Sequence, residues 1–473
     1  MKDIVLTTIN AKWIHPSLAL RLLKINLGTL EDRCEIIEFA LRQSLAEILE
    51  SLLAALVKEN GCARILGISV SIWNHTATLE LLGELDKTWK AAEHRPVVVL
   101  GGPEVSSLPP DAEIFRYADY VIRGEGEIAF RTLCEDILTG KMPVDINAKN
   151  VDVGKIKTAY HLYTNEDIAR KLIYVEASRG CPFNCEFCLS ADNTHIVREF
   201  PLEPFLAEMD TLVRRGVKTF KFLDRSFNVN IERARRICEF FLEKIEERKA
   251  DPDSEKPLVV HFEMVPSLFP DKLRQVLSRF PPGTLRLEIG VQTLNAEAAA
   301  RVGRPSRPEK ELEAIRFLRE KTHAIIHADL IAGLPGEDIA SFGRGFDRLW
   351  LALRAGNEEL EKCVPSEIQL GILKLLPGAL ISRHNESFGM RYNPKPPYEV
   401  EETSAMNALD IQRIKNFARF WELILNRYGF SLNFNTSSVF NSFMALSDLL
   451  FARFGRNWGI DKKELLKAAE DFY

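Results

Sequence analysis

The stretch ASRGCPFNCEFCLS at residues 177–190 places three of the chain's eight cysteines within eight positions. Their spacing is Cys181-x3-Cys185-x2-Cys188, and the stretch overlaps the end of a β-branched run, LIYVEAS, at residues 172–178. Three thiolates in one tight loop can hold three corners of a [4Fe–4S] cube. One iron would then lack a protein ligand and could be chelated by an incoming molecule.

A structural zinc site is the competing interpretation of the three cysteines. Zinc takes four ligands and usually a repeated C-x2-C spacing, so the fourth ligand would have to be His195 or a distant thiol. The remaining cysteines are scattered through apolar segments and are expected to be small buried hydrophobes. They are Cys34, Cys62, Cys134, Cys238 and Cys363.

The opening MKDIVLTTINAKW has an acid at position 3 and too short an apolar stretch for a signal peptide. No run approaches the roughly 20 apolar residues that span a bilayer. We therefore expect a cytoplasmic protein without membrane contact. In that reducing compartment, clustered cysteines indicate metal binding or catalysis rather than disulfides.

The 473 residues suffice for two or three domains, and the net charge of −5 gives no bulk attraction to polyphosphate. A local basic patch that binds RNA is possible, and the basic residues for it stand at 232–249, ERARRICEFFLEKIEERK. The charges of that run offset one another at helical spacing, so we predict a solvated amphipathic helix there. The composition disfavours nucleic acid as a partner.

Residues 1–140 alternate between short β-branched runs and segments with helical apolar spacing. Five such units with continuous apolar strands predict a buried parallel sheet, doubly wound in a flavodoxin-like order. Its ligand crevice would lie beyond the carboxyl ends of the strands. The predicted strands are 3–8, 34–39, 65–71, 96–100 and 119–122.

Unusual residues collect at those carboxyl ends. The segments are NAKWIHPS (10–17), SIWNHT (71–76), GGPEVSS (101–107) and RGEGE (123–127). Glycines there let the backbone approach a ligand and present amide donors, although tight βα turns need glycine in any case. Four such loops on one edge favour a ligand site.

Residues 141–170 lose the alternation and are predicted to be a linker. A second βα series over 171–375 predicts an incomplete (β/α)6 barrel. Residues 376–473 are predicted to be mostly helical, with the aromatic residues Trp421, Phe430 and Phe434 either in a core, which we favour, or in a lid. The predicted barrel strands are 172–178, 217–224, 258–264, 284–291, 324–331 and 366–374.

CPFNCEFC resembles the C-x3-C-x-Φ-C signature of the radical S-adenosylmethionine (SAM) enzymes, with Phe187 as the aromatic residue. The preceding series resembles the cobalamin-binding domain of the class B members, and the C-terminal region resembles a poorly characterised subgroup. The resemblance implies a [4Fe–4S] cluster whose open iron chelates SAM and cleaves it to a 5′-deoxyadenosyl radical.

Motifs at later strand ends resemble those of the branch that includes the oxygen-independent coproporphyrinogen oxidases. They are FEMVP (262–266), EIGVQT (288–293), RVGRPSR (301–307) and DLIAGLPGE (329–337), whereas FLDRSFNVN (222–230) lacks a Gly-Gly-Glu motif for the SAM amine. Taken singly, these acids could instead form ion pairs or helix caps. The implied SAM contacts are Phe187, Glu263, Glu288, Gln292, Arg304, Asp329 and Gly333 with the turn to Gly336.

The D-x-H-x-x-G hexapeptide that places a histidine below cobalt is absent from the sequence. The resemblance implies cobalamin held with its base displaced. His15 and His75 are single loop histidines, which are more often structural than metal ligands. The implied cobalamin contacts are Trp13, His15, Ser69, Ser71, Trp73, Gly101, Gly102, Glu104, Gly124, Glu125 and Gly126.

The resemblance implies methylation of an unactivated carbon through the radical and methylcobalamin. Its partners would be a small-molecule or peptide substrate and an electron donor such as flavodoxin or ferredoxin. The same cofactors could instead serve a cyclisation, rearrangement or oxidation. The sequence also allows a B12-independent RNA-modifying enzyme or a non-catalytic metal-stabilised binding module. Against methylthiolation, the first domain lacks an extra cysteine trio for a second cluster, because its three scattered cysteines are expected to be buried hydrophobes.

Overall fold

The computed structural model divides into two compact units. The first unit is Met1–Ala177 with Arg198–Lys221, and the second is Ser178–Val197 with Phe222–Tyr473. His195 and Cys363 lie outside the described residues. The structure describes residues 2–58, 61–90, 94–143, 146, 148, 150–190, 196–249, 257–304, 306–355, 366–430, 432, 434 and 437–472.

The first unit contains a five-stranded parallel sheet with the order β2-β1-β5-β6-β7. Numbered from one to five along the chain, these strands give 2-1-3-4-5, the flavodoxin-like order. The predicted doubly wound sheet is therefore confirmed. Its strands are β1 Ile4–Asn10, β2 Cys34–Ala40, β5 Ile65–Ser69, β6 Val97–Gly101 and β7 Tyr120–Val121.

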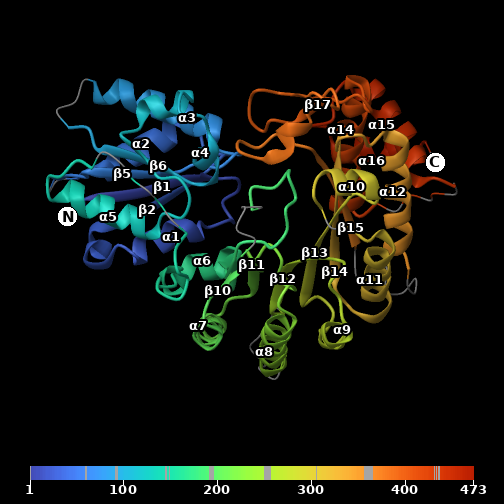
Figure 1. Ribbon diagram of the computed structural model, residues 1–473, viewed down its shortest axis with the longest axis horizontal. Coiled ribbons are helices and arrows are strands. Elements are labelled where there is room, and N and C mark those ends of the chain that lie inside the picture. The colour runs from blue at the N-terminus through green and yellow to red at the C-terminus, as the bar shows by residue number, and fades with distance from the viewer. Residues whose placement is uncertain are drawn as a thin grey trace. The chain divides into compact units, whose positions relative to one another are not determined.

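Helices cover both faces of this sheet (Figure 1). Alternate residues of β1 point to opposite faces, so Val5 packs in the core with α2 and α3 while Leu6 packs with α1 and α5. A capping box of Ser44 and Glu47 sets the start of α2. The helical elements are α1 Leu18–Ile25, η1 Gly28–Arg33, α2 Leu45–Leu56, α3 His75–Trp89, α4 Pro103–Ser107, η2 Glu113–Tyr117 and α5 Glu127–Leu138.

A short antiparallel hairpin, which was not predicted, joins β3 Val57–Lys58 to β4 Gly61–Cys62. It leaves Cys62 half-buried, so the prediction that this thiol is buried was wrong. Cys34, Cys134 and Cys238 are buried as predicted, and burial raises the pKa of the Cys34 thiol to about 12.

The segment predicted as a linker packs and contains helical turns. Val151, Val153 and Ile156 form a small core with Phe200, and Thr164 caps the helix that follows. The domain boundary at residue 140 stays a prediction. The elements between residues 160 and 222 are η3 Tyr160–Leu162, α6 Asn165–Arg170, β8 Ile173–Val175, β9 Ser178–Arg179, β10 Arg198–Glu199, α7 Leu202–Arg214 and β11 Thr219–Phe222.

The second large sheet has six strands in the order β15-β14-β13-β12-β11-β8. All six follow chain order and match the six predicted barrel strands. Because the sheet has two free ends, the barrel is incomplete, as predicted. The remaining strands of this sheet are β12 Val259–Met264, β13 Leu285–Gln292, β14 Ile325–Ala332 and β15 Ser366–Ile372.

Burial alternates along β12 and β14, because one face packs on helices and the other lines the barrel interior. Glu263 and Asp329 lie on the interior face of these strands. The predicted amphipathic helix at 232–249 is confirmed as α8, which buries Ile237, Cys238 and Phe241. The helices here are α8 Ile231–Lys249, α9 Asp271–Leu277, α10 Ala296–Arg301, α11 Pro308–Lys321 and α12 Ile339–Leu353.

The C-terminal region is mostly helical, as predicted. Trp421 is fully buried and packs on Phe346, Phe417 and Phe443, which confirms a core position rather than a lid for this residue. None of the described helices is long and apolar enough to cross a membrane. The elements are η4 Leu380–His384, β16 Arg391–Tyr392, β17 Val400–Glu402, α14 Ala408–Trp421, η5 Glu422–Arg427, α15 Val439–Phe454 and α16 Lys462–Glu470.

Candidate functional site

The cysteine loop follows β9 in the second unit and depends on a glycine. Gly180 has a φ of 93°, and an added Cβ would collide with the carbonyl oxygen of Ile196. The Cys188 amide donates to the Cys185 carbonyl at 2.9 Å, which closes a turn between these two cysteines. Cys185 is buried, whereas Cys181 and Cys188 are half-buried.

All three cysteines line one cavity of about 180 Å³ in the second unit. Phe183, Phe187 and Ser190 also belong to the cysteine loop, and the remaining lining residues come from β12, β13 and β14 or directly follow β11, β12 and α10. Barrel sites are built at the carboxyl edge of the strands. The lining residues are Cys181, Phe183, Cys185, Phe187, Cys188, Ser190, Arg225, Ser226, Glu263, Met264, Val265, Glu288, Gly290, Gln292, Arg304 and Asp329.

Each cysteine sulfur has a polar neighbour. The Ser190 amide donates to Cys188 Sγ at 3.4 Å, and Ser226 Oγ lies 3.4 Å from Cys181 Sγ. Arg304 Nη1 donates to Cys185 Sγ at 3.7 Å. Burial raises the pKa of the Cys185 thiol, and the Arg304 guanidinium offsets part of that rise. Donors aimed at sulfur suit thiolates that carry a cluster.

Among the residues that the structure describes, no group of three or more His, Cys, Asp or Glu side chains is placed to hold one metal ion. A zinc ion needs such a group, whereas an iron–sulfur cube spreads its ligands over separate corners. The choice between a cluster and zinc therefore stays a prediction from the cysteine spacing.

Three acids from adjacent strands line the same cavity. Glu263 on β12 pairs in register with Glu288 on β13, and Gly290 pairs with Asp329 on β14. Glu288 Oε2 lies 3.3 Å from His261 Nε2. Asp329 does not cap the next helix, because Asp338 is the N-cap of α12. Glu263 Oε2 lies 3.7 Å from Arg225 Nη1.

Gln292 occupies a strained backbone position at the end of β13. Its φ is 68°, in the left-handed region, and a register shift between Gly290 and Gln292 interrupts the pairing with β14. Arg304 donates to the Gly290 carbonyl. An added Cβ on Gly290 would lie 2.6 Å from Gln292 Nε2, so glycine gives this amide its place.

Gly333 does not line this cavity, and its contact with adenosine stays a prediction. Its φ is 88°, and an added Cβ would lie 2.6 Å from Val400 Cγ1 and 3.5 Å from Ile411 Cδ1. An added Cβ on Gly336 would lie 2.6 Å from Arg301 Nη1 and 3.0 Å from Phe388 Cε1. These glycines therefore let the turn after β14 pack against its neighbours.

The sequence motifs missed the part of the cavity contributed by residues 224–226. Arg225 and Ser226 line it, and the buried Asp224 accepts a hydrogen bond from Ser178 Oγ at 2.6 Å. These polar residues directly follow β11. Their place at a carboxyl strand end was the available signal, because the segment lacks the expected acidic glycine motif. Phe183, Ser190, Met264 and Val265 were also missed.

In the first unit, several predicted cobalamin contacts are hydrogen-bonded to protein. His15 Nδ1 lies 2.7 Å from Tyr174 Oη, and burial and nearby lysines lower the pKa of His15. His75 Nδ1 lies 2.9 Å from Oε1 of Glu104, which is buried. Such contacts are those expected of structural histidines.

Glu125 is also held by protein groups. Its carboxylate accepts from Arg198 at 2.8 and 2.5 Å and from the Val151 amide at 2.6 Å. Gly102 serves the turn, since its φ is 105° and an added Cβ would lie 2.5 Å from the Val70 carbonyl oxygen.

Two aromatic residues stand out at the carboxyl edge of the first sheet. Trp13 is 47% exposed in the loop after β1, and Trp73 is 52% exposed in the loop after β5. Ser71 is buried, whereas Ser69 and Gly101 are half-buried at the ends of β5 and β6. The remaining predicted residues of this edge are Gly124, with a φ of 90°, and Gly126 at the N-cap of α5.

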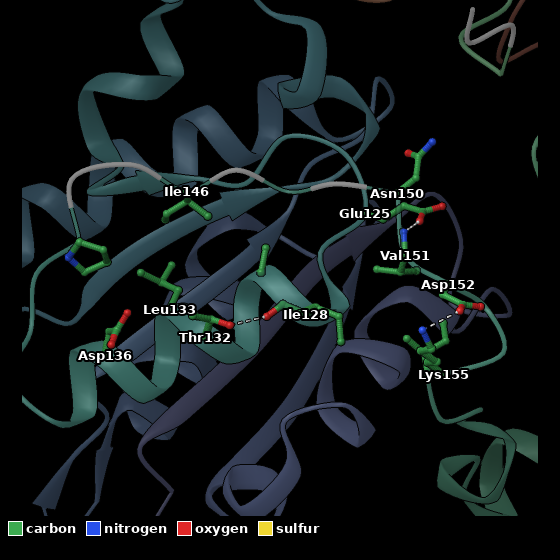
Figure 2. A pocket seen from close by; sticks show the side chains of 13 residues that line it. Glu125, Ile128, Thr132, Leu133, Asp136, Ile146, Asn150, Val151, Asp152 and Lys155 are labelled. Carbon is green, nitrogen blue, oxygen red and sulfur yellow. Dashed lines mark hydrogen bonds and ion pairs between the residues drawn. The ribbon is translucent and has the colours of Figure 1, made fainter. Parts of the chain in front are cut away.

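A cavity of about 460 Å³ lies elsewhere in the first unit, between α5 and the described residues among positions 143–156. Figure 2 shows the side chains that line it. Ile128, Leu133 and Ile146 make it largely apolar, and Lys155 lies at its rim beside Asp152. Of the predicted cobalamin contacts, Glu125 lines it. This cavity therefore follows the side of α5 rather than the row of strand-end loops.

Two family profiles match the chain in succession. The B12 binding domain matches residues 4–134, and the radical SAM superfamily matches residues 175–349. The cobalamin-dependent radical SAM methyltransferase TokK of Streptomyces tokunonensis is 23% identical over 370 residues, which are 71% of this chain and 50% of TokK. The 2-(S-pantetheinyl)-carbapenam-3-carboxylate methyltransferase of Streptantibioticus cattleyicolor is 23% identical over 375 residues, with 72% and 51% coverage. The chain thus spans about half the length of these curated relatives.

Solved structures show the same fold. The radical SAM methyltransferase TsrM from Kitasatospora setae, with cobalamin and a [4Fe–4S] cluster bound, has a TM-score of 0.61 at 18% identity, covering 86% of this chain and 83% of TsrM. The cobalamin-dependent SAM radical enzyme OxsB has a TM-score of 0.66 at 14% identity, with 99% and 78% coverage. A B12 binding domain and a radical SAM domain are thus both present, in this order along the chain.

Proposed function

We propose that this protein is a cobalamin-dependent radical SAM methyltransferase that methylates an unactivated carbon. The observation that carries the proposal is the cavity that brings the three cysteines together with the strand-end acids, Gln292 and Arg304. The B12 binding match ahead of it and the names of the relatives support methyl transfer.

When bound, a [4Fe–4S] cluster with an open iron supplies the electron that breaks a sulfonium bond of SAM, and cobalamin supplies a methyl carrier. Cys181, Cys185 and Cys188 would hold the cluster. Ser190 and Arg304 would donate hydrogen bonds to its thiolate ligands.

The other cavity residues would hold SAM. Glu263, Glu288 and Asp329 offer carboxylates to an ammonium and to hydroxyl groups, and the amide of Gln292 suits ribose hydroxyls. Arg304 already contacts Cys185 and Gly290, so a SAM carboxylate would share this guanidinium with them. Phe187 supplies an apolar wall that limits water.

The first unit would hold cobalamin at the carboxyl edge of its sheet. Exposed Trp13 and Trp73 offer apolar faces to a corrin ring, and Ser69, Gly101, Gly124 and Gly126 offer polar backbone or hydroxyl groups. An electron donor such as flavodoxin or ferredoxin and a small-molecule or peptide substrate complete the proposal. A cytoplasmic location suits thiolates that must remain reduced.

Anaerobic reconstitution of the full chain with iron, sulfide and cobalamin tests the proposal. With SAM and a reductant, we expect both S-adenosylhomocysteine and 5′-deoxyadenosine among the products. Formation of 5′-deoxyadenosine alone would favour a non-methylating radical reaction with the same cofactors. A protein that takes up zinc instead of a four-iron cluster and leaves SAM intact would overturn the proposal.

A further inference from the structure

Glu186 is a buried acid inside the cysteine loop, between Cys185 and Phe187. Its side chain is 5% exposed, and its carboxylate accepts from His384 Nε2 at 2.8 Å and from Arg383 Nη2. His384 is itself largely buried, whereas the Arg383 side chain is 63% exposed. Both partners belong to η4, in the C-terminal region of the second unit.

The backbone of Glu186 is held from two sides as well. Its amide donates to the Val302 carbonyl at 3.0 Å, at the end of α10, and its carbonyl accepts from the Ile381 amide at 3.0 Å, in η4. Gly303 strengthens the first attachment, because an added Cβ there would lie 2.7 Å from the Asn184 carbonyl oxygen. One residue of the loop thus joins two distant segments of the chain.

These contacts continue to the turn after β14. The His384 ring packs edge-on against Phe388 with centroids 5.8 Å apart, and the Arg301 guanidinium lies 5.4 Å above Phe388. Arg301 also donates to the Pro335 carbonyl at 3.3 Å. The C-terminal region therefore reaches the cysteine loop and the strand-end turn through one connected set of side chains.

A carboxylate beside three thiolates is electrostatically unfavourable, and its burial adds a desolvation cost. Cationic and hydrogen-bonding partners must offset both effects, and η4 supplies them. A small apolar residue between two cysteines would avoid these costs, so the presence of an acid at this position calls for another explanation. Its backbone and side-chain hydrogen bonds attach the segment between Cys185 and Cys188 to α10 and η4.

We infer that Glu186, Arg383 and His384 form a clamp, here called the loop clamp, that positions the cysteine ligands and sets the charge beside the cluster. The inference rests on the proposed function, because it requires a cluster at the three cysteines. These are positioning residues, which act through the cysteine loop. The clamp gives the C-terminal region a role in tuning cluster binding and reduction.

The test uses the full chain reconstituted anaerobically with iron and sulfide. We expect Glu186→Gln to weaken retention of iron against a chelator by about tenfold, the lower end of effects seen for groups that orient metal ligands. The midpoint potential should rise, because removing a negative charge stabilises the reduced cluster. Arg383→Gln should shift the potential the opposite way, by less, because its side chain is exposed to solvent. The electron paramagnetic resonance spectrum should change in Glu186→Gln with and without SAM.

Asp448→Asn is the matched control, because it removes the Arg413 ion pair at 2.7 Å between α14 and α15 without touching the cysteine loop. We expect it to lower the melting temperature while iron retention, spectrum and potential match the wild type. Should Glu186→Gln fail to fold, His384→Gln carries the same test, and Glu186→Asp should recover part of the iron retention.

The outcomes separate the two hypotheses. A wild-type chain that takes up no four-iron cluster overturns the proposed function and the clamp together. A wild-type chain that binds the cluster, with Glu186→Gln showing wild-type retention, spectrum and potential, overturns the clamp alone. Opposite potential shifts in the Glu186 and Arg383 variants support it, because general destabilisation would not reverse sign.

Discussion

The two sheets end in edges of different character. At the second sheet, every side chain expected to bind SAM lines one cavity with the cysteines. At the first sheet, His15, Glu104 and Glu125 are hydrogen-bonded to other protein groups. The comparison teaches that protein partners hold strand-end polar groups at both edges, and that the second edge differs in gathering its acids, Gln292 and Arg304 around one cavity with the cysteines.

Loss of a cysteine should have the largest effect of the substitutions considered, and it tests the edge of the second sheet. Cys185→Ala removes one of three proposed cluster ligands, so we expect complete loss of the cluster and of SAM cleavage. Iron and sulfide analysis with the visible spectrum measures it. Cys238→Ala, in the buried core of α8, is the control and should retain iron. Retention of a full cluster by Cys185→Ala would contradict the assignment.

Gly102→Ala should destabilise the first unit alone. Its φ of 105° and the 2.5 Å approach of an added Cβ to the Val70 carbonyl predict a cost of roughly 3 kcal/mol. Hydrogen exchange resolved along the chain should show faster exchange in β5 and β6, with the cysteine loop unaffected. Unchanged exchange in these strands would show that the turn tolerates the methyl group.

Glu337 should give the second unit a pH-dependent loss of stability. Burial raises the pKa of Glu337 from 4.5 to about 7, with Thr293 donating to its carboxyl group at 2.8 Å. The unfolded chain then releases this proton at lower pH than the folded chain. Stability should therefore fall as pH rises from 4.5 to 7, by roughly 3 kcal/mol.

Glu337→Gln cannot titrate and should remove that slope. Denaturant unfolding of both proteins at several pH values measures the difference. Thr293→Val serves as a comparison, since it removes the hydrogen bond but keeps the acid. A wild-type slope in Glu337→Gln would assign the pH dependence to other groups.

Glu125→Gln should have the smallest effect and tests the first edge directly. The variant weakens the ion pair between Glu125 and Arg198. Because both side chains are about four-fifths buried, we expect the free energy of unfolding to fall by about 2 kcal/mol. If Glu125 is purely structural, cobalamin affinity measured by equilibrium dialysis should stay at the wild-type value. A large fall in affinity with little loss of stability would restore Glu125 as a ligand contact.

Most strands were predictable because parallel strands buried on both faces carry continuous apolar runs. β1, β2, β5 and β6 each match a predicted run within two residues at either end. The hairpin of β3 and β4 was missed, because two-residue strands leave no periodic pattern. The helix α6 was missed for a similar reason, since its six residues are too few to form a recognisable apolar stripe.

The sequence by itself determined the succession of the two sheets, the position of the cysteine loop and the order of the strand-end motifs. Local patterns carry these features because apolar periodicity and cysteine spacing depend on neighbours in the chain. The tertiary structure alone decided that Glu186 meets η4, that Glu125 meets Arg198, and that Gly333 lies against Val400. Such pairings join residues far apart in sequence, and whether a polar group remains available to a ligand depends on them.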